Sequence, residues 1–208
     1  MFNINVRNEL AFAMQDLLAR TPVTEISTTT IAAECGLSRR TFYNYFEDKY
    51  DLMAFVYYIN SEKLWYRNGR ICTFTDAYTR HINNEHLSPA VLRNMFSYVG
   101  QNDVREFIIK KVGHDMRRMF YYNHRQKWLE EQDLQTAIEM LTYGMCAMFE
   151  HLMHGVGGNV PYADNIIKGI PEKYRAALLQ DPLAGGPRLD IPVFFLETCA
   201  WPPKLYLN

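Results

Sequence analysis

The stretch that decides the fold is residues 26–46, which read ISTTTIAAECGLSRRTFYNYF. Ser27 is placed to cap a short helix whose inward face carries Ile31 and Ala32. Ala32 is small at a point where a crossing helix must come close. Gly36 stands where this helix ends, because glycine adopts a positive backbone angle at little cost. The pattern predicts a short helix that closes in a glycine turn.

A second short helix follows the turn. Ser38 is placed to cap it, and Phe42 and Phe46 share its inward face at a spacing of four residues. Two short helices joined by a glycine turn indicate a helix-turn-helix, whose second helix enters the major groove of DNA.

The outward face of the second helix is rich in groups that recognise DNA. Arginine pairs with guanine O6 and N7, asparagine pairs with adenine, and the methyl group of threonine contacts that of thymine. Tyrosine hydroxyls and the Lys49 ammonium suit phosphates. A solvated helix carries one or two such residues by chance, but two adjacent arginines among several aromatic residues favour DNA recognition. The outward residues are Arg39, Arg40, Thr41, Tyr43, Asn44 and Tyr45.

The segment resembles the N-terminal part of TetR/AcrR-family transcriptional regulators. The family pattern runs from a hydrophobic-Ser/Thr start through an Ile-Ala pair, a glycine turn and a serine cap. It continues with Thr-hydrophobic-Tyr-x-aromatic-Phe and closes with a lysine and a leucine. This sequence matches over roughly residues 7–56, at Ile31-Ala32, Gly36, Ser38, Thr41-Phe42-Tyr43, Tyr45-Phe46, Lys49 and Leu52.

The resemblance implies a role for each matched position. The second helix lines the groove, while Thr28, Thr29 and Lys49 contact the DNA backbone or the groove edge. The implied DNA-binding residues are Thr28, Thr29, Arg39, Arg40, Thr41, Tyr43, Asn44, Tyr45 and Lys49. The implied structural residues are Ile31, Ala32, Gly36, Leu37, Phe42 and Phe46.

The charge of the segment departs from the family pattern. Residues 1–50 hold five basic and six acidic side chains, a balance of −1, whereas the family's first helix often brings a more basic end to the DNA. We therefore expect weak non-specific affinity, with binding that depends on the arginine-bearing helix and on dimerisation.

Helical periodicity continues along most of the chain and predicts an all-α fold. We expect a first helix over about 5–20, a long helix from near residue 48, and further helices around 71–82, 90–100, 103–126, 131–154 and 163–180. Prolines and glycines crowd the last segment. The predicted domains are a three-helix DNA-binding domain (1–50), a helical regulatory and dimerisation domain (51–181) and an irregular proline-rich tail (182–208).

The most regular periodic stretch, 131–154, is predicted to pack against another helix along its whole length. By the family resemblance it is one of two final helices that pair two subunits, so we expect a homodimer. The alternative is a helix of the subunit's own core. The predicted interface residues are Leu134, Ile138, Leu141, Met145, Met148, Phe149 and Leu152.

The family resemblance also implies an inducer pocket between the helices of the second domain. Aromatic side chains suit its walls, although each of them could equally fill a solid core. The candidates are Trp65, Tyr66, Phe74, Tyr78, Phe96, Tyr98, Phe107, Met116 and Tyr121. The basic residues of 103–128 are expected to form a solvated face, with an anionic ligand as the alternative; they are Lys110, Lys111, Arg117, Arg118, Arg125 and Lys127.

Composition excludes several other classes of protein. The longest apolar runs are too short to span a bilayer and no signal peptide is visible, so we expect a cytoplasmic protein without a membrane partner. The four cysteines form no CxxC pair and are expected to be small buried groups; they are Cys35, Cys72, Cys146 and Cys199. His151 and His154 lie one turn apart, but we interpret them as a polar helix end, and we expect no metal and no cofactor.

The sequence as a whole predicts a sequence-specific, DNA-binding transcriptional regulator. We expect a homodimer on a palindromic operator in double-stranded DNA, acting as a repressor that a small-molecule effector releases. An activator or a ligand-independent regulator would use the same DNA contacts. The remaining alternative is a helical enzyme or carrier with a vestigial helix-turn-helix. No arrangement of catalytic side chains supports it, so we predict that the protein is not an enzyme.

Overall fold

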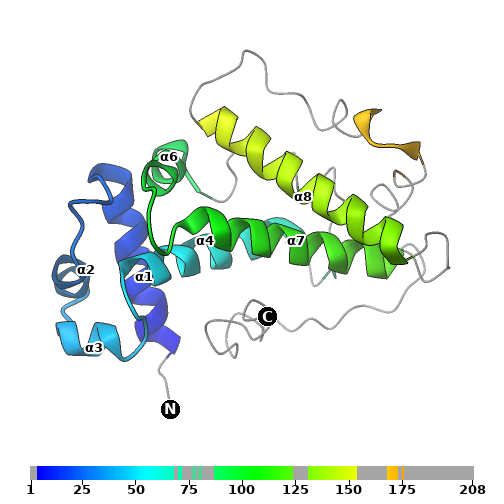
Figure 1. Ribbon diagram of the computed structural model, residues 1–208. Coiled ribbons are helices and arrows are strands. Elements are labelled where there is room, and N and C mark those ends of the chain that lie inside the picture. Colours follow the sequence, from blue (N-terminus) through cyan, green and yellow to red (C-terminus); the bar gives the residue numbers. More distant parts are fainter. Residues whose placement is uncertain are drawn as a thin grey trace. The chain divides into compact units, whose positions relative to one another are not determined.

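The computed structural model describes residues 4–67, 70–71, 77, 80, 87–123, 131–153, 168–172 and 175. Over these residues the fold is all-α, as predicted (Figure 1). The helices are α1 (Ile4–Arg20), α2 (Thr28–Glu34), α3 (Arg39–Tyr43), α4 (Lys49–Trp65), α6 (Pro89–Ser97), α7 (Val104–Asn123) and α8 (Glu131–Met153). One antiparallel pair of two-residue strands, β1 (Tyr66–Arg67) and β2 (Arg70–Ile71), follows α4.

The long predicted helices are confirmed to within a few residues at each end. The segment predicted over 71–82 is different at its start, because Ile71 belongs to β2. Ala77 and Arg80 are helical, and the rest of that segment lies outside the described residues. The segment predicted over 163–180 is described only at 168–172 and 175, and the proline-rich tail 182–208 is not described.

The chain divides into two compact units. Of the described residues, those within 4–60 and 87–108 form the first unit, and those within 61–86 and 109–193 form the second. The first unit reaches beyond residue 50 because α6 packs against α1. A single apolar core therefore joins the N-terminal helices to α6; its fully buried side chains include Leu10, Met14, Leu18, Ile31, Phe42, Leu52 and Leu92.

Helix α4 is buried on all sides over most of its length. Every residue from Leu52 to Glu62 is buried. A helix that is surrounded in this way belongs to the interior of a fold. Within the part of the chain that is described, no helix is both long and apolar enough to cross a membrane.

Helix α6 holds the connection between α1 and α2 through one side chain. The Asn94 amide oxygen accepts a hydrogen bond from the Val23 backbone N–H (2.8 Å), and the amide nitrogen donates to the carbonyls of Leu18 (2.8 Å) and Thr21 (2.6 Å). These groups lie at the C-terminal end of α1, where helix carbonyls lack intrahelical partners. Asn94 thus satisfies the backbone of a turn that is more than 70 residues distant in the sequence.

The second unit contains an ion cluster in its interior. The Lys111 side chain is 0% exposed, and its ammonium donates to the carboxylates of Glu62 (2.6 Å) and Asp115. The prediction that Lys111 belongs to a solvated basic face is therefore wrong. A buried ammonium is tolerated here because two carboxylates, one from α4 and one a turn further along α7, compensate for its lost hydration.

Helices α7 and α8 approach each other closely in the second unit. A Cβ atom at Gly113 would lie 3.5 Å from the Thr142 side chain, so the glycine leaves ordinary contact distance for a residue of α8. Ala137 and Ile138 are buried on the same helix. One face of α8 therefore contributes to the core of its own subunit, which is the alternative that the sequence analysis left open for this helix.

Candidate nucleic-acid interface

Both helices of the predicted helix-turn-helix begin with the same capping geometry. The Ser27 Oγ accepts a hydrogen bond from the Thr30 backbone N–H, and the Ser38 Oγ accepts one from the Thr41 backbone N–H, each at 3.0 Å. Each serine therefore satisfies a donor that a helix start leaves without an intrahelical partner. The two predicted caps are confirmed.

The turn between the helices depends on Gly36. Its φ of +65° lies in the left-handed region, where a Cβ atom causes strain. The turn closes with hydrogen bonds from the Gly36 N–H to the Ala33 carbonyl (3.0 Å) and from the Leu37 N–H to the Ala32 carbonyl (2.8 Å). The predicted glycine turn is therefore confirmed, and Gly36 is required by its backbone angle.

Two phenylalanines anchor α3 and the turn that follows it. Phe42 is 0% exposed and Phe46 is also buried, as predicted. The Phe42 and Phe46 rings lie 6.0 Å apart, and Phe46 lies 5.4 Å from Phe55 of α4, measured between ring centroids. This aromatic row attaches the inward side of α3 to the core, so the opposite side faces solvent.

The structure brings Arg39, Tyr43 and Thr28 together on the solvent side. The Arg39 Nη2 donates to the Tyr43 hydroxyl (3.3 Å), and the guanidinium carbon lies 5.4 Å from the centroid of the Tyr43 ring. The Tyr43 hydroxyl also lies 3.4 Å from the Thr28 Oγ1. These contacts with Thr28 and then Arg39 lower the pKa of Tyr43, which makes its hydroxyl a better donor to an anion.

The other predicted contact residues lie separately from this group. Arg40, Asn44 and Thr29 are exposed, while Thr41 and Tyr45 are half-buried. All of these side chains are at least partly accessible to solvent, and none is buried in the core.

Lys49 is engaged inside the protein. Its ammonium donates to the carbonyls of Val23 (2.7 Å), Ile26 (2.8 Å) and, at a longer distance, Thr24 (3.4 Å). A lysine has three N–H donors, so all three are directed at the connection between α1 and α2. Burial lowers the pKa of Lys49, and the neighbouring Asp48 carboxylate opposes that shift. This geometry gives Lys49 a structural role, and its predicted contact with DNA stays a prediction.

The start of α4 is held by a residue that the sequence analysis did not single out. The Asp48 Oδ1 accepts hydrogen bonds from the backbone N–H groups of Tyr50 and Asp51, both at 2.8 Å. Its Oδ2 accepts from the Asn102 side chain, also at 2.8 Å. An aspartate ahead of a periodic stretch is the signal of a helix cap. Nothing in the pattern indicated Asn102, which takes a positive φ of 61°.

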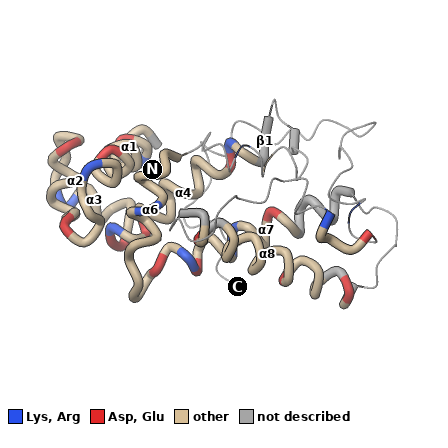
Figure 2. The backbone as a smooth tube through the Cα atoms, turned by 90° about the horizontal axis from the view of Figure 1, so that it is seen from above, with Lys and Arg blue, Asp and Glu red and all other residues tan. Residues whose placement is uncertain are grey.

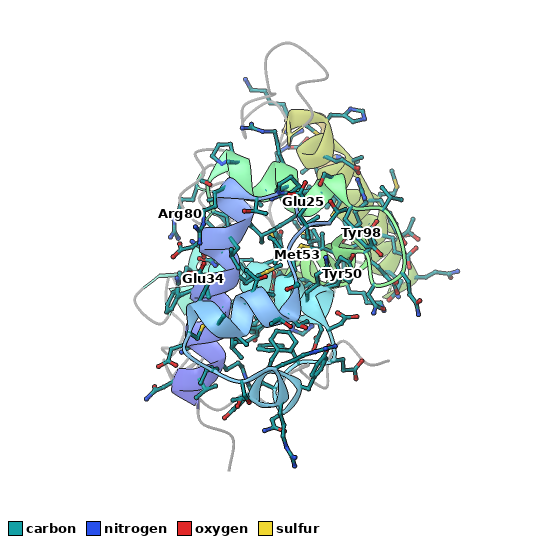
Figure 3. The ribbon with its side chains drawn as sticks, turned by 90° about the vertical axis from the view of Figure 1, so that its left-hand side faces the viewer. Glu25, Glu34, Tyr50, Met53, Arg80 and Tyr98 are labelled. Atoms are coloured by element: carbon teal, nitrogen blue, oxygen red, sulfur yellow. The ribbon has the colours of Figure 1, made fainter. Side chains whose placement is uncertain are left out.

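A tyrosine pair lies beside this capped helix start. The rings of Tyr50 and Tyr98 stack with centroids 4.1 Å apart and an angle of 17° between their planes (Figure 3). Desolvation, followed by the contact with Tyr98, raises the pKa of Tyr50 to about 12. Tyr98 was predicted to line a ligand pocket. In the structure its ring stacks on Tyr50 within the first unit.

Most basic side chains of the N-terminal segment are already committed to intramolecular contacts. Arg20 forms an ion pair with Glu34 (2.8 Å), and the Arg7 guanidinium lies 5.5 Å from the Phe55 ring centroid. Acidic and basic residues are both distributed over these helices (Figure 2). These contacts are consistent with the expected weak long-range attraction for DNA, which stays a prediction.

The remaining pocket candidates are distributed over both units. Phe96 is buried in the first unit, where the Arg105 guanidinium carbon lies 5.7 Å from its ring centroid, and Phe107 is half-buried there. Met116 is fully buried in the second unit. The side chains of Trp65, Tyr66 and Tyr121, and all of Phe74 and Tyr78, lie outside the described part. The inducer pocket stays a prediction.

The predicted dimer face of α8 is partly used within the subunit. Ile138 is buried, and Leu141, Met145 and Met148 are half-buried. The side chains of Leu134, Phe149 and Leu152 lie outside the described part. The exposed side of α8 instead carries Met140 (72% exposed), Tyr143 (60% exposed), Gly144 and Ala147.

Comparison with known proteins bears on the helix-turn-helix. Residues 15–55 match the family model described as "Bacterial regulatory proteins, tetR family". The match runs from the second half of α1 through α2 and α3 into α4, and it contains both serine caps, Gly36 and Phe42. No curated protein matches the chain.

Replacing Lys49 with methionine tests its structural role. The variant keeps most of the side chain's length but leaves three carbonyls without their charged donor. We expect the free energy of unfolding, measured by urea denaturation, to fall by about 1–3 kcal/mol.

Lys168→Met, which alters another exposed lysine, is the control and should stay within about 0.5 kcal/mol of the unaltered protein. The opposite result would be unchanged stability of Lys49→Met with weaker binding to every DNA sequence and a smaller salt dependence. That result would mean that Lys49 contacts a phosphate.

Proposed function

We propose that this chain, whose residues 15–55 match the TetR family of bacterial regulatory proteins, is a DNA-binding transcriptional regulator that acts as a dimeric repressor. In this proposal two subunits bind a palindromic operator in double-stranded DNA. A small-molecule effector lowers the affinity of the dimer for that site.

The observation that carries the proposal is the two-sided construction of α3. Phe42 is fully buried on one side, while Arg39, Arg40, Tyr43 and Asn44 are exposed on the other. A helix that serves only to fill the core does not require four exposed polar or aromatic side chains on so short a segment. A helix that enters the major groove needs donors and acceptors there.

Dimerisation follows from the limited reach of this helix. One α3 covers only a few base pairs, and the N-terminal segment has a net charge of −1, so a single subunit gains little from phosphate attraction. Two recognition helices about 34–36 Å apart match the half-sites of a palindrome and add their contributions.

We infer that the exposed strip of α8 is where a second copy of the chain docks. Met140, Tyr143, Gly144 and Ala147 recur at spacings of three and four and therefore share one helix face. Gly144 has nothing within 4 Å of the position of its absent Cβ atom, so another helix can come close there. This strip takes the place of the face predicted around Ile138.

Release by an effector is supported by the position of the buried ion cluster. Glu62 belongs to α4, and the same helix begins with Lys49, which holds the α1–α2 connection. A small molecule that changed the partners of Glu62 would act on the helix to which the DNA-binding segment is attached. An activator would share every DNA contact, and a reporter gene measured with and without the protein separates the two signs of regulation.

Selection from random duplex DNA by the purified full-length chain, at moderate salt, tests the proposed function. We expect enrichment of an inverted repeat whose half-sites lie one helical turn apart, or a multiple of it. The double variant Arg39→Ala, Arg40→Ala serves as the control, because both side chains are exposed and their loss spares the core; it should enrich nothing. A folded, dimeric wild-type protein that enriches no sequence would contradict the proposal.

Replacing Met140 with glutamate tests the docking face of α8. A charge at the centre of an apolar contact must be desolvated without a partner, so we expect sedimentation analysis to show a monomer where the unaltered chain is a dimer. Gln135→Glu introduces the same charge at another exposed position of α8 and should leave the dimer intact. A dimer that survives Met140→Glu would place the interface on another surface.

A further inference from the structure

The burial of Phe42 determines which residues of α3 point most directly outward. Successive residues of a helix are rotated by about 100°, so positions two before and two after Phe42 lie about 160° away from it. These positions are Arg40 and Asn44. Asn44 is the C-cap and keeps helical backbone angles (φ −72°, ψ −17°), so the same rotation extends to it.

Arg39 lies on a flank of the helix, about 60° from Phe42 by the same rotation. There its guanidinium lies against Tyr43 and donates to the Tyr43 hydroxyl, which in turn contacts Thr28 of α2. These three side chains form a bridge between α3 and α2, which we call the flanking triad. To reach a base edge, Arg39 would have to leave this bridge.

Arg40 and Asn44 are not held in this way. Both are exposed, and no hydrogen bond or ion pair of their side chains is found among the described residues. The donors of the guanidinium and both ends of the amide are therefore directed to solvent. Each can pair with a base without giving up an existing contact.

We propose that Arg40 and Asn44 read the bases of the operator, while the flanking triad of Arg39, Tyr43 and Thr28 binds the DNA backbone. Arginine pairs in a bidentate manner with guanine, and asparagine does so with adenine. The two residues are separated by four positions, or about 6 Å along the helix axis, which corresponds to roughly two base-pair steps of 3.4 Å. Each half-site should therefore contain a guanine and an adenine about two base pairs apart.

The flanking triad has the chemistry of a phosphate contact. The Tyr43 hydroxyl accepts a hydrogen bond from Arg39, and when Thr28 donates to it as well its own proton is available for donation; its lowered pKa makes it a stronger donor. A guanidinium and a phenol side by side match the oxygens of a phosphodiester. Such a contact positions α3 without reading sequence. This division of roles rests on the proposed function and assigns a particular task to each arginine.

The test uses the duplex enriched by the full-length chain, with each base pair of one half-site replaced in turn. Competition binding is measured for the wild type and for Arg40→Ala, Asn44→Ala and Arg39→Ala. For the wild type, replacing the guanine or the adenine should weaken binding by roughly 5- to 150-fold, the affinity equivalent of one bidentate pair. Arg40→Ala should abolish the preference at the guanine, and Asn44→Ala the preference at the adenine.

Arg39→Ala is the matched control, since it removes the same side chain from the neighbouring position. It should weaken all duplexes by a similar factor and keep both base preferences. Arg40→Lys retains the charge but lacks the fork that pairs with guanine, so it too should lose the preference. Circular dichroism of each variant checks that the fold is retained.

Two failures can be told apart. If the wild type prefers a palindrome but Arg39→Ala abolishes a base preference that Arg40→Ala retains, the assignment of roles is overturned and the regulator function stands. If the folded wild type shows no preference for any duplex, the proposed function itself fails, and this inference fails with it.

Discussion

The complete burial of the Phe42 side chain is the constraint on which the rest of the DNA-binding unit depends. Helix α3 has only five residues, too few to be stable alone, and the Phe42 ring attaches it to the core beside Phe46 and Phe55. Burial of one such ring contributes about 1.5–3 kcal/mol. It also sets the rotation of the helix about its axis. Because Phe42 points inward, the polar residues on the opposite side must face solvent, and the recognition surface follows from a core contact.

A second set of contacts holds the connections around this helix in place. Lys49 binds carbonyls of the α1–α2 connection, Asn94 binds the same connection from α6, and Asp48 caps α4 while accepting a hydrogen bond from Asn102. Each satisfies backbone or capping groups that would otherwise lack a partner. The cationic charge of Lys49 is used internally, and Arg20 is paired with Glu34. We therefore expect this segment to gain its affinity for DNA from shape and from specific hydrogen bonds.

The sequence predicted the parts of this arrangement that depend on neighbouring residues. The caps at Ser27 and Ser38 and the turn at Gly36 involve groups within five positions of one another, so their spacing is visible in the chain. The spacing of four between Phe42 and Phe46 likewise marked the inward face of α3. Partners that are distant in the sequence could not be predicted. The hydrogen bonds of Lys49 were not predicted, because nothing nearby showed that carbonyls 23 to 26 positions earlier would accept them. Lys111 looked solvated because Glu62 precedes it by 49 residues. The apolar stripe of α8 could be seen in the sequence. Which side of the helix the core of its own subunit would cover could not be predicted.

Methylation interference on the selected duplex tests the central claim, that α3 reads base edges in the major groove, most directly. Dimethyl sulfate methylates guanine at N7 in the major groove and adenine at N3 in the minor groove, so one reaction compares the two grooves. The account predicts that methylation of one guanine N7 in each half-site prevents binding, because that atom pairs with Arg40. It also predicts that methylated adenine N3 is tolerated beneath α3. Interference from adenine N3 alone, or no interference within the half-sites, would contradict it.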